Sequence, residues 1–375
     1  MSDRPEAERR RRRWTSAVLG AGKAPGKTRG AGRVSREPEP EPVPVPEPEP
    51  LAAVPAVTAA DRVRGLRLLG WVTAVVLAVV VAAWAVWVTG PPTEADLRAE
   101  AGLLGRRELL IGVKDDTPGI SLRNSATGRF AGFDIEVAYL IAAELGFTPG
   151  QVRFLAIETE DRERMQAREA DGRFVTVDLV VATFSITPAR LGNPGVSFSA
   201  PYLENEQSVV TGRKHGRVTA LGDLRGEKVC TLGTSTSETQ AAEAGAVVTG
   251  KNRISECIAG LKKGDFDAVT TDAAILAGFV SAEPSVLRHH DIGLTTSEKW
   301  GVNTGTNKAL RTLVDLALYR SYADPKDRRW EDAFDRYLGA AQKTNRPQQV
   351  AVGEQPRVAE PQVRRWPWER TVPRR

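Results

Sequence analysis

One long stretch near the start of the chain, from Leu68 to Thr93, carries no charged residue and is rich in Val, Ala and Leu. The 21 residues 68–88 match the roughly 20 that an apolar helix needs to cross the hydrocarbon core of a membrane. Trp71 lies near one end of this stretch, and Trp84 and Trp87 lie near the other, as in an aromatic belt. The pattern predicts a transmembrane helix over residues 68–88.

The charges beside this stretch predict its orientation. Arg62, Arg64 and Arg67 precede it, whereas Glu94 and Asp96 follow it, and basic residues favour the cytoplasmic side. We therefore expect a cell-membrane protein with one span, a cytoplasmic N-terminus and everything beyond about residue 90 outside the cell. A buried core helix and a late signal peptide cleaved near residues 83–85 are the alternatives. A core helix rarely runs so long without a charge, and a signal peptide usually starts earlier.

Beyond the span, apolar runs of strand length alternate with segments of helical period. Strand-like runs occupy residues 109–113, 178–182, 228–230 and 268–271, and helical spacing occurs over 134–145 and 254–261. Gly146 and Gly264 stand where these two helices should end. The alternation predicts an α/β architecture.

The two ends of the chain differ from this middle part in composition and charge. Residues 1–60 contain a run of five Arg and a stretch of Glu-Pro and Val-Pro repeats, which predicts a disordered cytoplasmic segment. Residues 341–375 are polar, Pro-rich and basic, and we expect a disordered tail there. The net charge of +5 for the whole chain belongs to these ends, because residues 68–340 are net acidic. Nucleic-acid binding is therefore not expected, since it needs a basic face on the folded region.

The chain has two cysteines, Cys230 and Cys257, and both follow the predicted span. An even pair in an exported domain favours a disulfide, although two separate buried thiols are the alternative. Such a bridge would stabilise the fold by about 3 kcal/mol in the chain-entropy model. No cysteine adjoins the end of the apolar stretch, which excludes a lipid-modified cysteine as the anchor there.

Polar residues at the ends of three strand-like runs suit a free amino acid. Arg190 follows the run that ends near Ser185, and its fork of N–H donors can grip an α-carboxylate. Residues 233–236 open a helix after a strand, so their free N–H groups favour an anion. Asp272 ends another strand and can accept the α-ammonium group. Each feature alone is more often a surface ion pair or a helix cap, and only the combination indicates a binding site.

Several segments in order resemble the bacterial extracellular solute-binding proteins of family 3, which capture polar amino acids. They are residues 110–114, 128–136, 182–190, 201–202, 221–229 and 264–272. The resemblance covers roughly residues 107–340 and implies a two-lobe periplasmic-binding-protein type II fold. Lobe 1 would comprise residues 107–202 and 299–340, and lobe 2 residues 207–297.

The resemblance also implies ligand-binding residues from both lobes: Thr183, Ser185 and Arg190 from lobe 1, and Ser235, Thr236 and Asp272 from lobe 2. Within the family, residues 114–124, 182–186 and 270–276 are similar to the glutamate-binding proteins of actinobacterial uptake systems. Those proteins also carry a Cys pair, at the positions of Cys230 and Cys257. A second ligand carboxylate needs a second cation, which Lys114 or Arg123 could supply.

These observations lead to an expected function. We expect membrane-anchored, extracytoplasmic binding of an acidic amino acid, with glutamate favoured, that supplies an ABC permease. The alternative is a receptor domain that reports amino-acid availability to a membrane signalling partner. An enzyme on the same fold is a remote alternative, because the three His lack metal-ligand spacing and no Ser-His-Asp or paired-carboxylate motif is evident. No cofactor or metal is expected.

Overall fold

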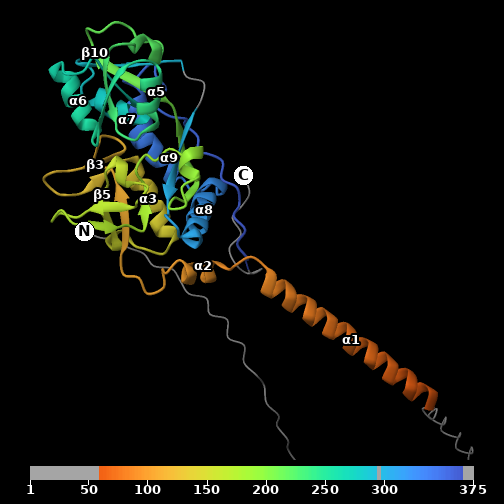
Figure 1. Cartoon of the computed structure of the whole chain (residues 1–375). Helices are drawn as coiled ribbons and strands as arrows, with labels where there is room; N and C mark the ends of the chain where they lie inside the picture. Colours follow the sequence, from red (N-terminus) through yellow and green to blue (C-terminus); the bar gives the residue numbers. More distant parts are fainter. Residues whose placement is uncertain (1–58, 294–296, 366–375) are drawn as a thin grey trace, which may run out of the picture. The chain divides into compact units, whose positions relative to one another are not determined.

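The computed structural model describes residues 59–293 and 297–365 (Figure 1). Of the predicted disordered segment, residues 1–60, the first 58 lie outside this description, as do the last ten residues of the chain, whereas residues 59 and 60 begin helix α1. Helix α1, Ala59–Thr89, contains the stretch Arg62–Ala85, which has a mean hydropathy of 2.4 and no buried residues. This helix is long and apolar enough to cross a membrane, as the sequence predicts.

The α/β alternation is present and its strands form two large sheets. The first sheet has the order β7-β6-β5-β1-β8-β15-β9, with β1 parallel to β5 and β8, and β15 antiparallel to β8 and β9. Its strands are β1 Leu109–Val113, β5 Val152–Ala156, β6 Gln166–Arg168, β7 Phe174–Thr176, β8 Leu179–Val180, β9 Phe198–Asn205 and β15 Glu298–Asn303. We call this sheet and the elements packed on it lobe 1.

The second sheet has the order β12-β11-β13-β10-β14, with β11 parallel to β12 and β13, and β10 antiparallel to β13 and β14. Its strands are β10 Gln207–Gly212, β11 Lys228–Leu232, β12 Val247–Lys251, β13 Ala268–Asp272 and β14 Leu287–His290. We call this sheet and its helices lobe 2. The chain enters lobe 2 between β9 and β10 and returns between β14 and β15, so two crossovers connect the lobes.

Helices cover both sheets, and Figure 1 shows α5, α6 and α7 grouped around β10. The helices after α1 are α2 Glu94–Glu100, α3 Phe133–Glu144, α4 Pro188–Leu191, α5 Thr236–Glu243, α6 Ile254–Lys263, α7 Ala273–Ala282, α8 Lys308–Ala323, α9 Arg329–Phe334 and α10 Ala340–Gln342. A small sheet of β2 Asp116–Thr117, β3 Ser121–Arg123 and β4 Phe130–Ala131 precedes α3. The core of lobe 1 includes the fully buried rings of Phe133, Tyr202, Trp300 and Trp330.

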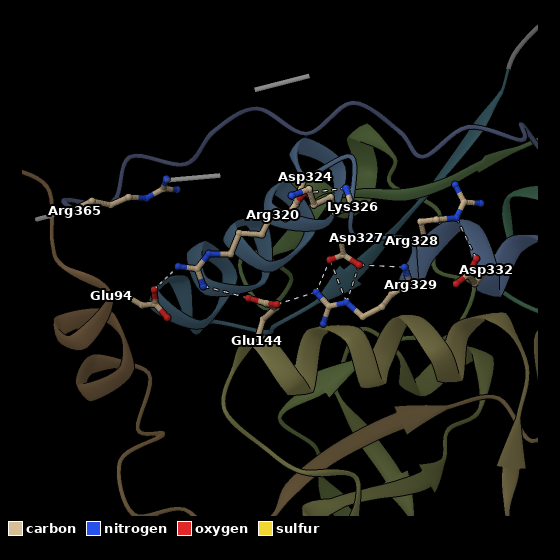
Figure 2. Close-up of a pocket in the computed structure, with 10 residues that line it drawn as sticks. All are labelled: Glu94, Glu144, Arg320, Asp324, Lys326, Asp327, Arg328, Arg329, Asp332 and Arg365. Atoms are coloured by element: carbon tan, nitrogen blue, oxygen red, sulfur yellow. Dashed lines mark hydrogen bonds and ion pairs between the residues drawn. The ribbon is translucent and has the colours of Figure 1, made fainter. Parts of the chain in front are cut away.

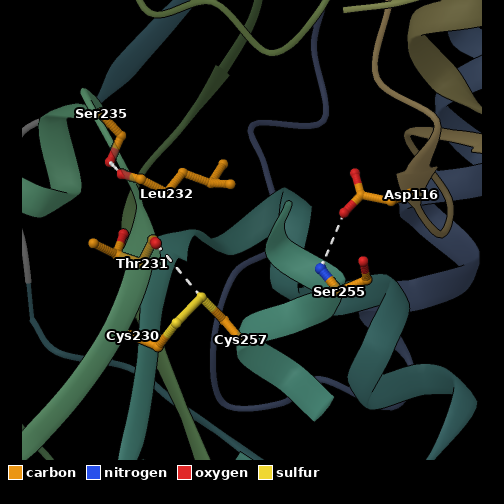
Figure 3. The surroundings of a disulfide bond; sticks show 7 residues. All are labelled: Asp116, Cys230, Thr231, Leu232, Ser235, Ser255 and Cys257. Carbon is orange, nitrogen blue, oxygen red and sulfur yellow. Dashed lines mark hydrogen bonds between the residues drawn. A yellow bond between two sulfur atoms is a disulfide. The ribbon is translucent and has the colours of Figure 1, made fainter. Parts of the chain in front are cut away.

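The predicted disulfide joins Cys230 on β11 to Cys257 on α6, and both residues are fully buried (Figure 3). It ties the helix to the central part of the second sheet. Immediately before Cys257, the backbone N–H of Ser255 donates a hydrogen bond of 3.0 Å to Asp116 Oδ2 from the small sheet. The disulfide therefore also steadies a point at which α6 contacts the other lobe.

A second contact between the lobes depends on a glycine. A Cβ atom added to Gly278 on α7 would lie 1.8 Å from the carbonyl oxygen of Pro118, which follows β2. Because no side chain fits in that space, only glycine permits α7 and this loop to approach so closely. The lobes are thus in a closed arrangement at this position.

The C-terminal segment differs from the expectation of a disordered tail, because its part up to residue 365 packs on the domain. The Asn345 side chain is fully buried, donates to the Ala277 carbonyl at 3.1 Å and pairs with His289 Nδ1 at 2.5 Å. Further along, Val352 N–H donates to the Glu204 carbonyl, and Arg364 N–H donates to the Pro92 carbonyl, each at 2.9 Å. The polar composition hid this packing, since buried amide side chains here find hydrogen-bond partners.

Candidate site between the two lobes

Arg190 lies on the short helix α4, which Thr187 caps by accepting a hydrogen bond from the Arg190 N–H. Its guanidinium Nη1 donates to the Ser185 carbonyl at 2.8 Å, and Nη2 donates to the Thr234 carbonyl in lobe 2 at 3.1 Å. The carboxylate of Glu163 lies in ion-pair range of Arg190, with Arg190 Nε and Glu163 Oε1 3.7 Å apart. Burial lowers the pKa of Arg190, so its charge is incompletely compensated.

Thr183 has an unusual backbone conformation in the loop that precedes Ser185. Its φ of 48° lies in the left-handed region, which costs a β-branched residue on the order of 1–3 kcal/mol. The Thr183 N–H donates to Asp134 Oδ2 at 3.0 Å, and its carbonyl accepts from Arg162 Nη1 at 2.8 Å. Burial raises the pKa of Asp134 to about 8. These buried bonds hold the loop in the strained conformation and fix where Ser185 lies.

Two hydroxyl-bearing residues from lobe 2 stand at the start of α5. Ser235 is the N-cap, and its Oγ accepts from the Glu238 N–H at 3.2 Å and donates to the Leu232 carbonyl at 2.6 Å. The Glu238 carboxylate accepts a hydrogen bond from the Thr234 N–H at 2.7 Å. The Thr236 hydroxyl instead donates to the carboxylate of Glu298, at 2.8 Å to Oε1.

Asp272 ends β13 and is almost completely buried. Its Oδ2 accepts a hydrogen bond from the indole Nε1 of Trp300 in lobe 1. Burial and, after it, the negative charge of Glu298 raise the pKa of Asp272 well above its ordinary value. The positive charge of Arg162 works in the opposite direction but does not offset burial, so this carboxylate is unfavourable in its charged form.

These residues line one cavity between the lobes. Its lining contains six of the predicted site residues together with four others: Thr183, Ser185, Arg190, Ser235, Thr236 and Asp272, with Arg162, Leu232, Thr271 and Ile275. The cavity has a volume of about 10 Å³, which is room for about one water molecule. The structure thus brings the two predicted halves of the site together in a closed form.

Lys114 and Arg123 do not line this cavity. Lys114 is buried behind it, where its Nζ donates to Thr159 Oγ1 and to the Asn252 carbonyl, each at 3.2 Å. Burial lowers the pKa of Lys114. Arg123 is an exposed residue of β3 whose guanidinium carbon lies 5.8 Å from the Phe130 ring centroid.

Sequence reasoning missed two residues of the site, Arg162 and Glu298. Arg162 is buried, and its Nη1 donates to the carbonyls of Ala182 and Thr183. Burial and, after it, the charge of Arg190 lower the pKa of Arg162 to about 9. Its run of charged neighbours, residues 160–164, resembles a solvated surface, which is why the sequence did not single it out. Glu298 begins β15, where no motif marks it.

A larger cavity of about 800 Å³ lies on lobe 1 and is also rich in charges (Figure 2). Figure 2 shows Arg320 between Glu94 and Glu144, with nitrogen–oxygen distances of 2.7 and 3.2 Å. Arg329 contacts Glu144 at 2.8 Å and Asp327 at 2.5 Å. Ten charged residues line this cavity, five of each sign. It is an ion-pair network that largely neutralises itself, and we do not assign it as the ligand site.

Comparison with known proteins shows the family of this chain. The model for bacterial extracellular solute-binding proteins of family 3 matches residues 109–340. The chain belongs to that family. The family fold has two lobes and is the periplasmic-binding-protein type II fold, which agrees with the two sheets and the two crossovers.

The chain is similar to several characterised binding proteins. The glutamate-binding protein GluB of Corynebacterium efficiens is 29% identical over 252 residues, which cover 63% of this chain and 80% of that protein. The glutamine-binding protein GlnH of an ABC transporter of Bacillus subtilis is 32% identical over 181 residues, which cover 48% of this chain and 63% of that protein. Among solved structures, an ancestral arginine-binding protein bound to glutamine is 27% identical with a TM-score of 0.54, covering 62% of this chain and 99% of that one. The family and these relatives are binding proteins rather than enzymes.

Proposed function

We propose that this family member binds an amino acid between its lobes, that the preferred ligand is glutamate, and that an ABC-type uptake system receives it. The observation that supports this proposal best is the electrostatic state of the cavity. Burial lowers the pKa of Arg162 and of Arg190 and raises that of Asp272. The charged forms of Arg162, Arg190 and Asp272 are therefore destabilised by burial, and a ligand of complementary charge would stabilise them.

Each charged group has a partner in the proposed ligand. Arg190 would bind the α-carboxylate, because it lies beside Ser185 and reaches Thr234 across the lobes. Asp272 would bind the α-ammonium group, with the Thr183 carbonyl as a further acceptor. Arg162 would attract the side-chain carboxylate, the role that the sequence suggested for Lys114 or Arg123. Two guanidinium groups for two carboxylates favour an acidic amino acid over glutamine or arginine.

Ligand entry requires the lobes to separate. A cavity of about 10 Å³ cannot hold an amino acid, so we propose that the lobes separate by movement at the two crossovers, one between β9 and β10 and the other between β14 and β15. A ligand that contacts both lobes then favours closure by its differential affinity for the closed state.

Location supports uptake from outside the cell. Helix α1 is suited to anchor the domain, and the family is extracellular. An anchored binding domain can deliver its ligand to a permease in the same membrane. The sensing alternative has no observation in its favour, and we do not pursue it.

Calorimetric titration of the full chain in lipid nanodiscs tests the proposal, with glutamate, aspartate, glutamine and arginine as ligands. We expect saturable heat with glutamate, weaker heat with aspartate and glutamine, and the weakest with arginine. Binding of none of the four would contradict amino-acid binding. Tighter binding of glutamine or arginine would contradict only the assignment of glutamate.

A further inference from the structure

The carboxylate of Glu298 occupies a central position between the lobes. Its Oε2 accepts a hydrogen bond of 2.5 Å from the Ser185 hydroxyl of lobe 1. The Thr236 hydroxyl of lobe 2 donates to Oε1 at 2.8 Å and to Oε2 at 3.0 Å. One side-chain carboxylate thus joins two of the hydroxyl groups that we assign to the ligand, one from each lobe.

The same carboxylate acts on the two charged groups of the site. Burial lowers the pKa of Arg190. The negative charges of Glu163, Glu298 and Asp272 each act in the opposite direction. Glu298 also adds to the effect of burial in raising the pKa of Asp272. In position and charge, Glu298 therefore resembles the α-carboxylate of a bound amino acid, which would be attracted by Arg190 and would face the two hydroxyl groups.

Glu298 also lies beside the connections between the lobes. It is the first residue of β15 and pairs in register with Asn205, the last residue of β9. Both strands adjoin the crossovers between the lobes. From this position one side chain, that of Glu298, contacts both Ser185 of lobe 1 and Thr236 of lobe 2.

We propose that the Glu298 carboxylate is an internal substitute for the ligand carboxylate, which holds the empty protein closed and must be displaced when an amino acid binds. This inference rests on the proposed function for its ligand but makes a separate statement about the ligand-free protein. A fraction of the protein that is closed on itself cannot bind ligand, and the apparent affinity falls by that fraction. Glu298 would thereby set both the affinity and the resting state of the lobes.

The first test compares glutamate binding by the wild-type chain and by Glu298→Gln, each full length in nanodiscs. Charge-assisted hydrogen bonds contribute enough that their removal should tighten glutamate binding by about tenfold. Glu204→Gln is the matched control, because Glu204 lies on the neighbouring strand and its carboxylate pairs with Lys299 at 3.2 Å, whereas that of Glu298 accepts from Ser185 and Thr236. We expect no change in affinity for that variant. Unchanged or weaker binding by Glu298→Gln would overturn the inference and would indicate that Glu298 helps to hold the ligand.

The second test needs no ligand. Spin labels on Arg107→Cys in lobe 1 and Lys214→Cys in lobe 2 report the distance between the lobes by pulsed electron resonance, since both positions are exposed. Without amino acid, Glu298→Gln should shift the distribution toward open distances, whereas Glu204→Gln should leave it unchanged. Glu298→Ala serves as a second variant, and thermal melts check that each variant is folded. If the wild type binds no amino acid, the proposed function fails, and this measurement still decides whether Glu298 closes the lobes.

Discussion

Two groups of arginines and carboxylates in this protein have opposite electrostatic character. In the network on lobe 1, the hydrogen bonds that Arg329 donates to Asp327 raise the pKa of Arg329, and hydrogen bonds from Arg320 and Arg98 outweigh burial and lower that of Glu94. Between the lobes, burial dominates, so the pKa values of Arg162 and Arg190 are lowered and that of Asp272 is raised. The first group satisfies its own charges, whereas the second lacks partners that a ligand would supply. Cavity size alone would have pointed to the wrong one.

The largest effect that separates the two groups is expected for Arg190→Ala. Loss of the guanidinium removes the bidentate partner that we propose for the α-carboxylate, so glutamate binding should weaken by at least about a hundredfold. Arg190→Lys should recover only part of the affinity, because an ammonium group cannot form the fork of two hydrogen bonds. Calorimetry gives the affinities. If Arg190→Ala lowers glutamate affinity by less than about threefold, Arg190 does not bind the ligand carboxylate.

The next effect is expected for Asp272→Asn, which should change binding and stability in opposite directions. The variant loses the charge that we assign to the ligand ammonium, so affinity should fall by about 10- to 100-fold. The raised pKa makes the ionised form of Asp272 unfavourable in the folded protein. The free energy of unfolding is therefore highest at low pH and declines as pH rises through the raised pKa. The ligand-free variant should therefore melt at a higher temperature than the wild type near pH 7. A lower melting temperature would contradict the comparison.

Gly278→Ala tests whether burial between the closed lobes causes the electrostatic difference between the two groups of charged residues. The added Cβ would collide with the Pro118 carbonyl and hold the lobes apart, which admits water to the cavity. We expect glutamate affinity to fall by about tenfold, because closure becomes unfavourable. Gly260→Ala is not a neutral control, since its Cβ would contact Phe266; Gly222→Ala has open space and serves instead. Equal affinities for both variants would show that closure does not need this contact.

The smallest effect is expected in the network on lobe 1. Arg329→Ala should leave glutamate affinity unchanged and destabilise the protein by about 1 kcal/mol, since exposed ion pairs contribute little. Because hydrogen bonds from Arg329 outweigh burial and lower the pKa of Asp327, the stabilisation by this pair is present near neutral pH and is lost as pH falls below about 4. Melting curves at several pH values should show a smaller acid dependence in the variant. A change in glutamate affinity would contradict a purely structural role.

The same contrast explains what the sequence could predict. Arg190, Asp272 and the start of α5 follow strand-like runs directly, so local patterns and the family resemblance were enough to propose them. Arg162 and Glu298 depend on tertiary packing, because Arg162 stands among charged neighbours and Glu298 begins a strand after a polar loop. No local signal shows that either side chain turns inward.

The C-terminal segment shows the same limit at larger scale. Its polar, Pro-rich composition predicted disorder, yet Asn345 and Gln348 are fully buried and hydrogen-bonded. Average composition cannot report that a few amide groups find partners in a groove. The alternation of strands and helices was predictable because burial of apolar faces imposes it on the whole domain.

The return of the C-terminal segment to Pro92 has a mechanical consequence. The chain reaches lobe 1 just after α1, and residue 364 returns to the same place, where its N–H bonds to the Pro92 carbonyl. A pull on either end of the domain is therefore carried mainly by one side of lobe 1. Lobe 2 does not lie on this short path between the two ends, although the C-terminal segment also contacts it at Asn345.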